Sequence, residues 1–213
     1  MTEEGAKNKW VGWRARVGGR LLNSPLRRLA EALVMGNGSS LLLREVRGSL
    51  RGGDVVLDAG CGSGYLSIPI TRMLADGQVV CLDSSMDMLA LLERKLRKAG
   101  LEGRTRTVLT DAADSGLADA SIDIVVSMNL VHELGSPADA MAEWVRVLKP
   151  GGRTLVVDFR DTPFVRRFMR HGHDEEAHGP FFAEELSGLM SDAGLDDVKV
   201  EPRRNVLVAS GRK

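Results

Sequence analysis

The sequence predicts a three-layer α/β fold, with a mainly parallel sheet covered by helices on both faces. From Asp54 to Asp158, short apolar strands alternate with amphipathic helices, and a helix that joins parallel strands must pack back onto their sheet. The chain has 213 residues, 43% of them hydrophobic, and 29 basic residues balance 29 acidic ones. This ordinary globular composition, without internal repeats, indicates one domain with a substantial core.

The expected elements follow from apolar periodicity and from the residues that begin and end helices. We expect strands at 55–57, 79–83, 105–110, 122–127, 154–158, 198–200 and 206–209. We expect helices at 65–74, 84–99, 136–148 and 184–193. Ser84, with Asp87 three residues later, has the pattern of a capping box, and Gly100 ends that helix. Ser136 and Pro137 supply an N-cap and a first-turn proline to the next helix.

Two regions fall outside this alternation. Residues 10–50 have their apolar residues at helical spacing, so we expect 1–50 to be a helical segment on the substrate side, ahead of a domain at 51–213. Residues 1–52 carry ten Lys or Arg and four Asp or Glu. This basic balance either meets an acidic partner or forms solvated helix faces. Residues 159–183 interrupt the strand and helix order, and we expect them to form a lid insertion.

Composition argues against several protein classes. The longest stretch without a charge, 59–71, is shorter than the ~20 apolar residues of a membrane-spanning helix. Charged residues near the N-terminus interrupt the apolar stretch that a secretory signal needs. Cys61 and Cys81 lie in apolar segments rather than at metal-ligand spacing, which disfavours a disulfide framework or a zinc site. We therefore expect a cytoplasmic monomer or homodimer without a membrane span.

The segment 56–64, Val-Leu-Asp-Ala-Gly-Cys-Gly-Ser-Gly, follows a strand and leads into a helix. Glycines in this place let the backbone approach a ligand closely. A dinucleotide fingerprint needs a small residue three positions after Gly62, where this chain has Tyr65. Asp58 would also face a phosphate badly and a cation well. The turn therefore favours a nucleoside ligand with a cationic centre.

Acidic residues end the next two expected strands, at Asp83 and Asp111. A carboxylate at the first position can accept hydrogen bonds from both ribose hydroxyls, and one at the second can accept from an adenine amino group. Open parallel sheets bind ligands at the carboxyl ends of their strands. We therefore expect Asp58, Asp83 and Asp111 to converge on one crevice.

These features, together with Asp111-Ala112 and the segment 146–152, Arg-Val-Leu-Lys-Pro-Gly-Gly, carry a family resemblance. The sequence resembles the class I S-adenosylmethionine-dependent methyltransferases, specifically their ubiquinone/menaquinone-biosynthesis-like, or type 11, group. The resemblance implies a Rossmann-like sandwich with a seven-stranded sheet, whose last strand, 206–209, runs antiparallel. It also implies S-adenosyl-L-methionine as cofactor and S-adenosyl-L-homocysteine as product.

The resemblance places the methionine end of the cofactor on the glycine turn. It implies that Asp58 and Gly60 hold the amino end, and that Gly62 and Gly64 leave room for the cofactor, with Cys61 between them. In the alternative interpretation the glycines only shape a turn.

The resemblance places ribose and adenine on the next two strand ends. It implies that Asp83 binds the ribose and that Ser84 and Met88 border ribose and adenine. Asp111 would accept from the adenine amino group, and Ala112 would offer adenine a backbone N–H. In the alternative interpretation the two aspartates cap helices.

Residues just past the fourth expected strand are candidates for the methionine and substrate sides. Asn129 lies where the family's backbone often meets the methionine moiety, as the resemblance implies. Methyl transfer from a sulfonium needs alignment and exclusion of water, and a base where the acceptor must lose a proton. His132 is the candidate for this catalytic role. Otherwise it packs against, or caps, the next loop.

The expected lid contains all five phenylalanines and three of the four histidines. Its candidate substrate-contacting residues are Phe159, Phe164, Phe168, His171, His173, His178 and Phe181. The spacing of Phe164 and Phe168 also fits the core face of a helix. The histidines either bind a metal, contact substrate or lie in a solvated loop, and no second ligand cluster supports the metal. Arsenite-methylating relatives use cysteines near the acceptor, and this lid has none, which argues against arsenite.

The leading hypothesis is a methyltransferase that acts on a small, partly apolar or aromatic acceptor by in-line displacement. One alternative, favoured by the basic N-terminal segment, is methylation of RNA or protein. Against it, residues 127–130, Ser-Met-Asn-Leu, lack the Asn-Pro-Pro-Tyr type signature of enzymes that methylate nucleic-acid amino groups. The other alternative is a protein that binds S-adenosylmethionine without catalysis.

Overall fold

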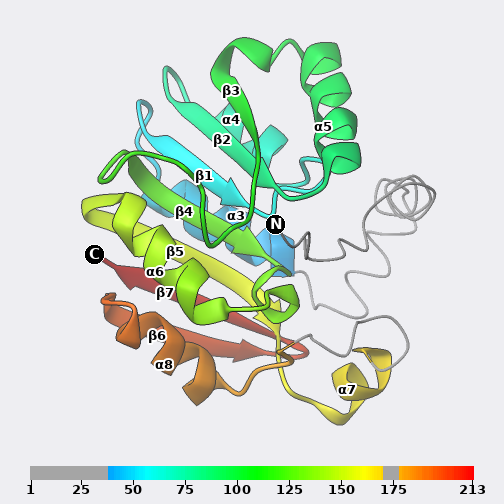
Figure 1. Cartoon of the computed structure of the whole chain (residues 1–213), viewed down its shortest axis with the longest axis vertical. Coiled ribbons are helices and arrows are strands. Elements are labelled where there is room, and N and C mark those ends of the chain that lie inside the picture. The colour runs from blue at the N-terminus through cyan, green and yellow to red at the C-terminus, as the bar shows by residue number, and fades with distance from the viewer. Residues whose placement is uncertain (1–37, 170–177) are drawn as a thin grey trace, which may run out of the picture.

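A computed structural model describes residues 38–169 and 178–213, and its centre is one seven-stranded sheet (Figure 1). The strands are β1 (Val55–Ala59), β2 (Gln78–Asp83), β3 (Thr105–Leu109), β4 (Ile122–Met128), β5 (Leu148–Phe159), β6 (Asp196–Arg203) and β7 (Val206–Arg212). They lie in the order β3-β2-β1-β4-β5-β7-β6. Neighbours from β3 to β5 pair in parallel, whereas β7 pairs antiparallel with both β5 and β6. The predicted fold class is confirmed.

Helices cover both faces of the sheet. On one face lie α3 (Gly38–Ser49), α4 (Ser67–Met73) and α5 (Met86–Ala99), and on the other lie α6 (Pro137–Val147) and α8 (Ala183–Asp192). Two 3-10 turns, η1 (Glu102–Arg104) and η2 (Val131–Glu133), lie in the connections. The short helix α7 (Pro163–Met169) lies beyond the carboxyl end of β5 (Figure 1).

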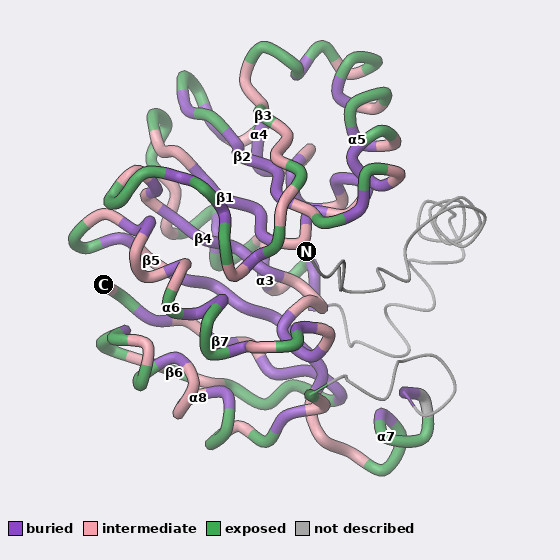
Figure 2. Tube along the Cα trace, viewed as in Figure 1, coloured by how far each residue is buried: buried purple, intermediate pink, exposed green. Residues whose placement is uncertain are grey.

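Two apolar cores hold the layers together, and Figure 2 shows the buried residues along the strands and the inward helix faces. One core joins α3, α4 and α5 to the sheet, and the other joins α6 and α8 to it. Leu42 and Val46 of α3 are fully buried in the first core. The described part of the expected N-terminal segment thus packs with the main domain, while residues 1–37 lie outside the described residues.

Two details differ from the sequence-based expectations. The N-cap of α5 is Ser85 rather than Ser84: its side chain accepts from the Met88 N–H at 3.4 Å, while Ser84 is exposed. The Asp83 carboxylate accepts from the Ser85 N–H at 2.8 Å, which fixes the entry to the helix one residue later. Strand β5 begins at Leu148 rather than at the expected residue 154, and residues 149–152 form a bulge within it, where the register shifts opposite Ile122 and Ile124.

None of the helices within 38–169 and 178–213 has the length and hydrophobicity that a bilayer crossing requires.

Candidate active site

The glycine turn joins the end of β1 to α4 at the carboxyl edge of the sheet. Gly60, Gly62 and Gly64 have φ angles of 72°, 50° and 85°, in the left-handed region that favours glycine. The N–H groups of Gly60 and Cys61 both donate to the Leu82 carbonyl at 2.9 Å, which ties the turn to β2. The backbone path of the turn is therefore set by its glycines.

The three glycines have different surroundings. A Cβ on Gly60 would meet Leu130 at 2.9 Å, and one on Gly64 would lie 2.3 Å from Leu92 of α5. A Cβ on Gly62 would meet nothing within 4 Å. Packing therefore explains Gly60 and Gly64, whereas Gly62 borders open space. The Cys61 side chain is buried in the core, and its thiol pKa is raised by burial and by the neighbouring Cys81.

Asp58, on β1 directly before the turn, is buried with 1% exposure. Its Oδ2 accepts a hydrogen bond of 2.5 Å from the Ser67 hydroxyl of α4. Burial raises the pKa of this carboxyl to about 7, Ser67 opposes the shift, and the nearby Asp83 adds to it. The position thus holds a carboxyl that a bound cation would convert to its charged form.

Asp83 ends β2 beside the turn. Its Oδ2 accepts from the Gly62 N–H at 2.8 Å, and its Oδ1 accepts from the Ser85 N–H at 2.8 Å. Each carboxylate oxygen can accept more than one hydrogen bond, so both keep capacity for ligand hydroxyls. Burial raises the pKa of Asp83, these two N–H groups lower it, and Glu133 raises it further. In the described part of the chain, neither Asp58 nor Asp83 forms an ion pair.

The predicted adenine side lies at the end of β3. Asp111 is exposed, and its Oδ1 accepts from the Ala113 N–H at 2.8 Å. Thr110, next to it, donates its N–H to the Asp83 carbonyl at 3.3 Å, so the ends of β2 and β3 are joined. Ala112 and Met88 are buried. The structure thus places Asp83 and Asp111 at adjacent strand ends, and Met88 in the first turn of α5.

His132 lies in η2, after β4, and is buried with 1% exposure. Its Nδ1 lies 2.6 Å from Oδ1 of Asp158, a fully buried residue of β5, and its Nε2 lies 3.6 Å from Oε1 of Glu133. Although burial alone lowers the pKa of His132, Asp158 and Glu133 raise it to about 9. His132 thus belongs to a buried pair with Asp158, and its predicted base role stays a prediction.

The expected lid residues lie in different places. Phe159 and Phe181 are buried, and the Phe159 ring meets the His132 ring edge-on with centroids 4.9 Å apart. Phe164 on α7 is 51% exposed, so it does not lie on a core face. His178 is exposed, and its N–H donates to the His132 carbonyl at 3.0 Å. His171, His173 and the side chain of Phe168 lie outside the described residues.

Three neighbours of the site escaped the sequence analysis as functional candidates: Ser67, Glu133 and Asp158. Asp158 had a signal, because it is the second-last residue of its strand, as Asp58 is of β1. Asn129, which was predicted, adopts φ 56° and donates its N–H to the Val157 carbonyl at 2.9 Å. Among the described residues, no group of three or more His, Cys, Asp or Glu is arranged to hold a metal ion.

Comparison with known proteins decides the family. Residues 57–156 match the family described as "Methyltransferase domain". The ubiquinone/menaquinone biosynthesis C-methyltransferase UbiE of Enterobacter sp. (strain 638) is 34% identical over 175 residues, which cover 70% of this chain and 69% of that protein. The chain belongs to the class I S-adenosylmethionine-dependent methyltransferases, in their UbiE-like group. The predicted family and its cofactor, S-adenosylmethionine, are confirmed.

Other similarities define the limits of this assignment. An uncharacterised protein of a Streptomyces fradiae transposon is 31% identical over 166 residues, which cover 73% of this chain and 47% of that protein. Several curated relatives are likewise matched over less than half of their own length. A methyltransferase from Aquifex aeolicus shares the fold with a TM-score of 0.71 and 22% identity, covering 92% of this chain and 97% of that one. The [4+2]-cyclase SpnF also shares it, with a TM-score of 0.70, 21% identity and coverage of 82% and 80%. The fold alone therefore does not decide the reaction.

Proposed function

We propose that this protein transfers a methyl group from S-adenosylmethionine to a small, partly apolar or aromatic acceptor by in-line displacement. The observation that carries the proposal is the pair of carboxyls at the glycine turn, Asp58 and Asp83. Each has a raised pKa, and within the described residues neither has an ion-pair partner. A cofactor with ammonium and sulfonium charges would supply the missing cations.

The same residues fit the cofactor's uncharged parts. Asp83 can accept from ribose hydroxyls, Gly62 leaves its side-chain space open, and Asp111 and Ala112 lie on the next strand end for adenine. Asn129 comes directly after β4, on the methionine side. The cofactor would supply an activated methyl group, so the chain's own task is to align the acceptor and exclude water.

The acceptor class is supported by the apolar groups near the ends of β4 and β5. The Phe159 ring packs against the His132 ring, and the buried Phe181 donates its N–H to the Phe159 carbonyl at 3.0 Å. The Enterobacter relative is named a ubiquinone/menaquinone biosynthesis C-methyltransferase. With the His132 pKa raised to about 9, a base role for this residue is not part of the proposal. An acceptor whose own hydroxyl ionises, such as an acidic phenol that reacts at oxygen or at the ring carbon that the ionised hydroxyl activates, suits such a site.

Isothermal titration tests the cofactor half of the proposal. We expect S-adenosylmethionine and S-adenosylhomocysteine to bind the purified protein in the micromolar range, and NAD not to bind. Absence of binding to a folded sample would refute the proposal.

Turnover tests the catalytic half. Formation of S-adenosylhomocysteine is measured with a panel of phenols, quinol rings, amines, RNA and protein. Acceptor-dependent formation with a small ring compound is the expected result. Binding without turnover on any acceptor would favour a protein that binds S-adenosylmethionine without catalysis. Turnover on RNA or protein would favour an RNA or protein methyltransferase.

A further inference from the structure

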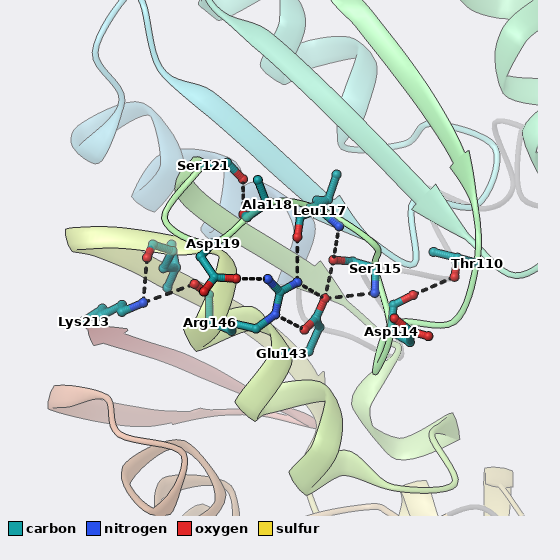
Figure 3. A network of polar contacts seen from close by, with 11 residues as sticks. Thr110, Asp114, Ser115, Leu117, Ala118, Asp119, Ser121, Glu143, Arg146 and Lys213 are labelled. Atoms are coloured by element: carbon teal, nitrogen blue, oxygen red, sulfur yellow. Dashed lines mark hydrogen bonds and ion pairs between the residues drawn. The ribbon is translucent and has the colours of Figure 1, made fainter.

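The connection between β3 and β4, residues 110–121, contains no helix or strand and includes the predicted adenine residues, Asp111 and Ala112. Ala112 and Leu117 anchor it by burial in the core on the α6 side. Figure 3 shows that Glu143 and Arg146 of α6 contact Ser115, Leu117 and Asp119 of this segment. We call residues 110–121 the β3–β4 connection.

Glu143 and Arg146 of α6 form the centre of this polar network (Figure 3). Oε1 of Glu143 accepts from the Ser115 N–H at 3.0 Å and also from the Ser115 hydroxyl. Arg146 Nε donates to Glu143 Oε2 at 2.7 Å, and its Nη2 donates to Glu143 Oε1 at 2.8 Å. Nη2 also donates to the Leu117 carbonyl at 2.7 Å, while Nη1 pairs with Asp119.

The network is held by charge. The hydrogen bond from Arg146 lowers the pKa of Glu143, burial opposes the shift, and the hydrogen bonds from Ser115 lower the pKa further, to about 2. The Glu143 side chain is 9% exposed and that of Arg146 is 37% exposed. Hydrogen bonds to charged groups are stronger than those between neutral groups, and this bidentate arrangement fixes direction as well as distance. The middle of the connection is therefore fixed on α6.

The other end of the connection is fixed on the sheet. Thr110 donates its N–H to the Asp83 carbonyl at 3.3 Å, and its hydroxyl donates to the Asp114 carbonyl at 2.7 Å. Asp111 and Ala112 therefore lie in a short turn between two anchors, one on β2 and one, through Ser115, on Glu143. Releasing either anchor would let this turn move.

We propose that Glu143 and Arg146 are positioning residues that set Asp111 and Ala112 against the adenine ring of the cofactor. The inference rests on the proposed function. Neither residue is a catalytic residue: they hold backbone groups of the connection rather than the ligand. Their effect is on selectivity for the nucleobase of the cofactor, because an adenine amino group is recognised only when the accepting carboxylate lies in the right direction.

Base discrimination is the readout. S-adenosylhomocysteine and S-inosylhomocysteine differ by an amino group in place of a carbonyl oxygen on the purine. We expect the wild-type protein to bind the adenine compound at least about tenfold more tightly by titration calorimetry, since the inosine oxygen would face the Asp111 carboxylate. We expect Arg146→Gln and Glu143→Gln to reduce this ratio to less than about threefold, as Asp111→Asn does directly.

Arg203→Gln is the matched control, because Arg203 pairs with Glu201 on the exposed strand β6. It should leave the ratio unchanged. If Arg146→Gln and Glu143→Gln weaken both ligands equally and keep the wild-type ratio, the positioning role is overturned. Arg146→Lys, which keeps the charge but loses the fork, should give an intermediate ratio and guards against misfolding of the other variants.

Amide hydrogen exchange provides a second measurement that needs no ligand. The Ser115 and Leu117 amides should exchange faster in Glu143→Gln than in the wild type, while β1 amides stay unchanged. Unchanged exchange at Ser115 would overturn the anchor itself. If the wild-type protein binds neither nucleoside, the proposed function fails with the inference that rests on it, whereas binding with an unaltered ratio in the variants refutes the inference alone.

Discussion

Two buried aspartates at the carboxyl edge of the same sheet are neutralised in different ways. Asp58 of β1 meets a serine hydroxyl and lies near a second carboxyl, Asp83, and its pKa is raised to about 7. Asp158 of β5 meets the buried ring of His132 at 2.6 Å, which raises the pKa of that histidine to about 9. Among the residues that the structure describes, a counter-ion is supplied to Asp158 and none to Asp58.

The difference separates a ligand site from a structural pair. A buried carboxyl with a partner inside the protein needs nothing more, whereas one without a cation remains costly until a cation arrives. Position at a strand end is thus insufficient to identify a functional aspartate. Four experiments test the comparison between the β1 and β5 ends.

The largest effect is expected from Asp158→Ala. The change would leave the buried His132 ring, and the N–H groups of His132 and Phe159, without the carboxylate that accepts from them. We therefore expect the free energy of unfolding to fall by about 3 to 5 kcal/mol in urea denaturation. The double variant His132→Leu/Asp158→Leu should recover much of this loss. Glu201→Gln, which breaks the exposed pair with Arg203, should cost less than about 1 kcal/mol. A small effect of Asp158→Ala would mean that the pair is not the buried ion pair described above.

The next effect is the pH dependence that His132 gives to folding. Its folded pKa lies above its unfolded value of 6.5, at about 9. The contribution to stability is therefore complete below pH 6.5 and is lost as the pH rises through 9. We expect a decrease of about 3 kcal/mol over this window, measured by denaturation at each pH. In Asp158→Asn, the free energy of unfolding should depend much less on pH over this range. An unchanged dependence in that variant would contradict the pairing of His132 with Asp158.

At the β1 and β2 end, Asp83→Ala should act on the ligand rather than on folding. The variant loses a charge-assisted acceptor for the ribose, so S-adenosylmethionine affinity should fall by about 1.5 to 3 kcal/mol, measured by calorimetry. Asp76→Ala, at an exposed position just before β2, is the matched control and should bind normally. An unchanged affinity in Asp83→Ala would refute the ribose site.

The smallest effect is the pH dependence of binding through Asp58. With its pKa at about 7 in the free protein, the carboxyl must lose a proton to meet a cationic ligand at lower pH. S-adenosylmethionine affinity should therefore rise by up to about tenfold per pH unit below 7 and level off above it. Calorimetry in buffers of different ionisation enthalpy counts the released proton. Asp58→Asn should remove the pH dependence, and persistence of the slope would place the titrating group elsewhere.

The sequence predicted the sheet and the glycine turn well because their signals are local. Each apolar run that predicts a strand, and the Ser136–Pro137 pair that begins a helix, is a signal contained within a few residues. The environment of His132 is not local: Asp158, its partner, lies 26 residues away. Only the register of β4 with β5 brings the two together, so the sequence alone left a base and a packing role open.

The contacts of the β3–β4 connection also depend on residues that are distant in the sequence. Nothing within residues 110–121 indicates that Ser115 meets Glu143, 28 residues further on. Gly64 likewise fits a cofactor turn in the sequence, whereas in the fold it makes room for Leu92 of α5. Long-range packing decides such roles, and the roles assigned to the cofactor residues stay predictions until ligand binding is measured.

The position of β7 between β5 and β6 has a consequence for the order of assembly. β6 joins the sheet only through β7, so β7 must pair with β5 before β6 does or together with it. Until β7 docks, β5 presents an open edge of unpaired backbone groups, the kind of surface on which folding intermediates associate. Pulse-labelled hydrogen exchange during refolding should show β5 and β7 amides becoming protected together, after those of β1 and β2.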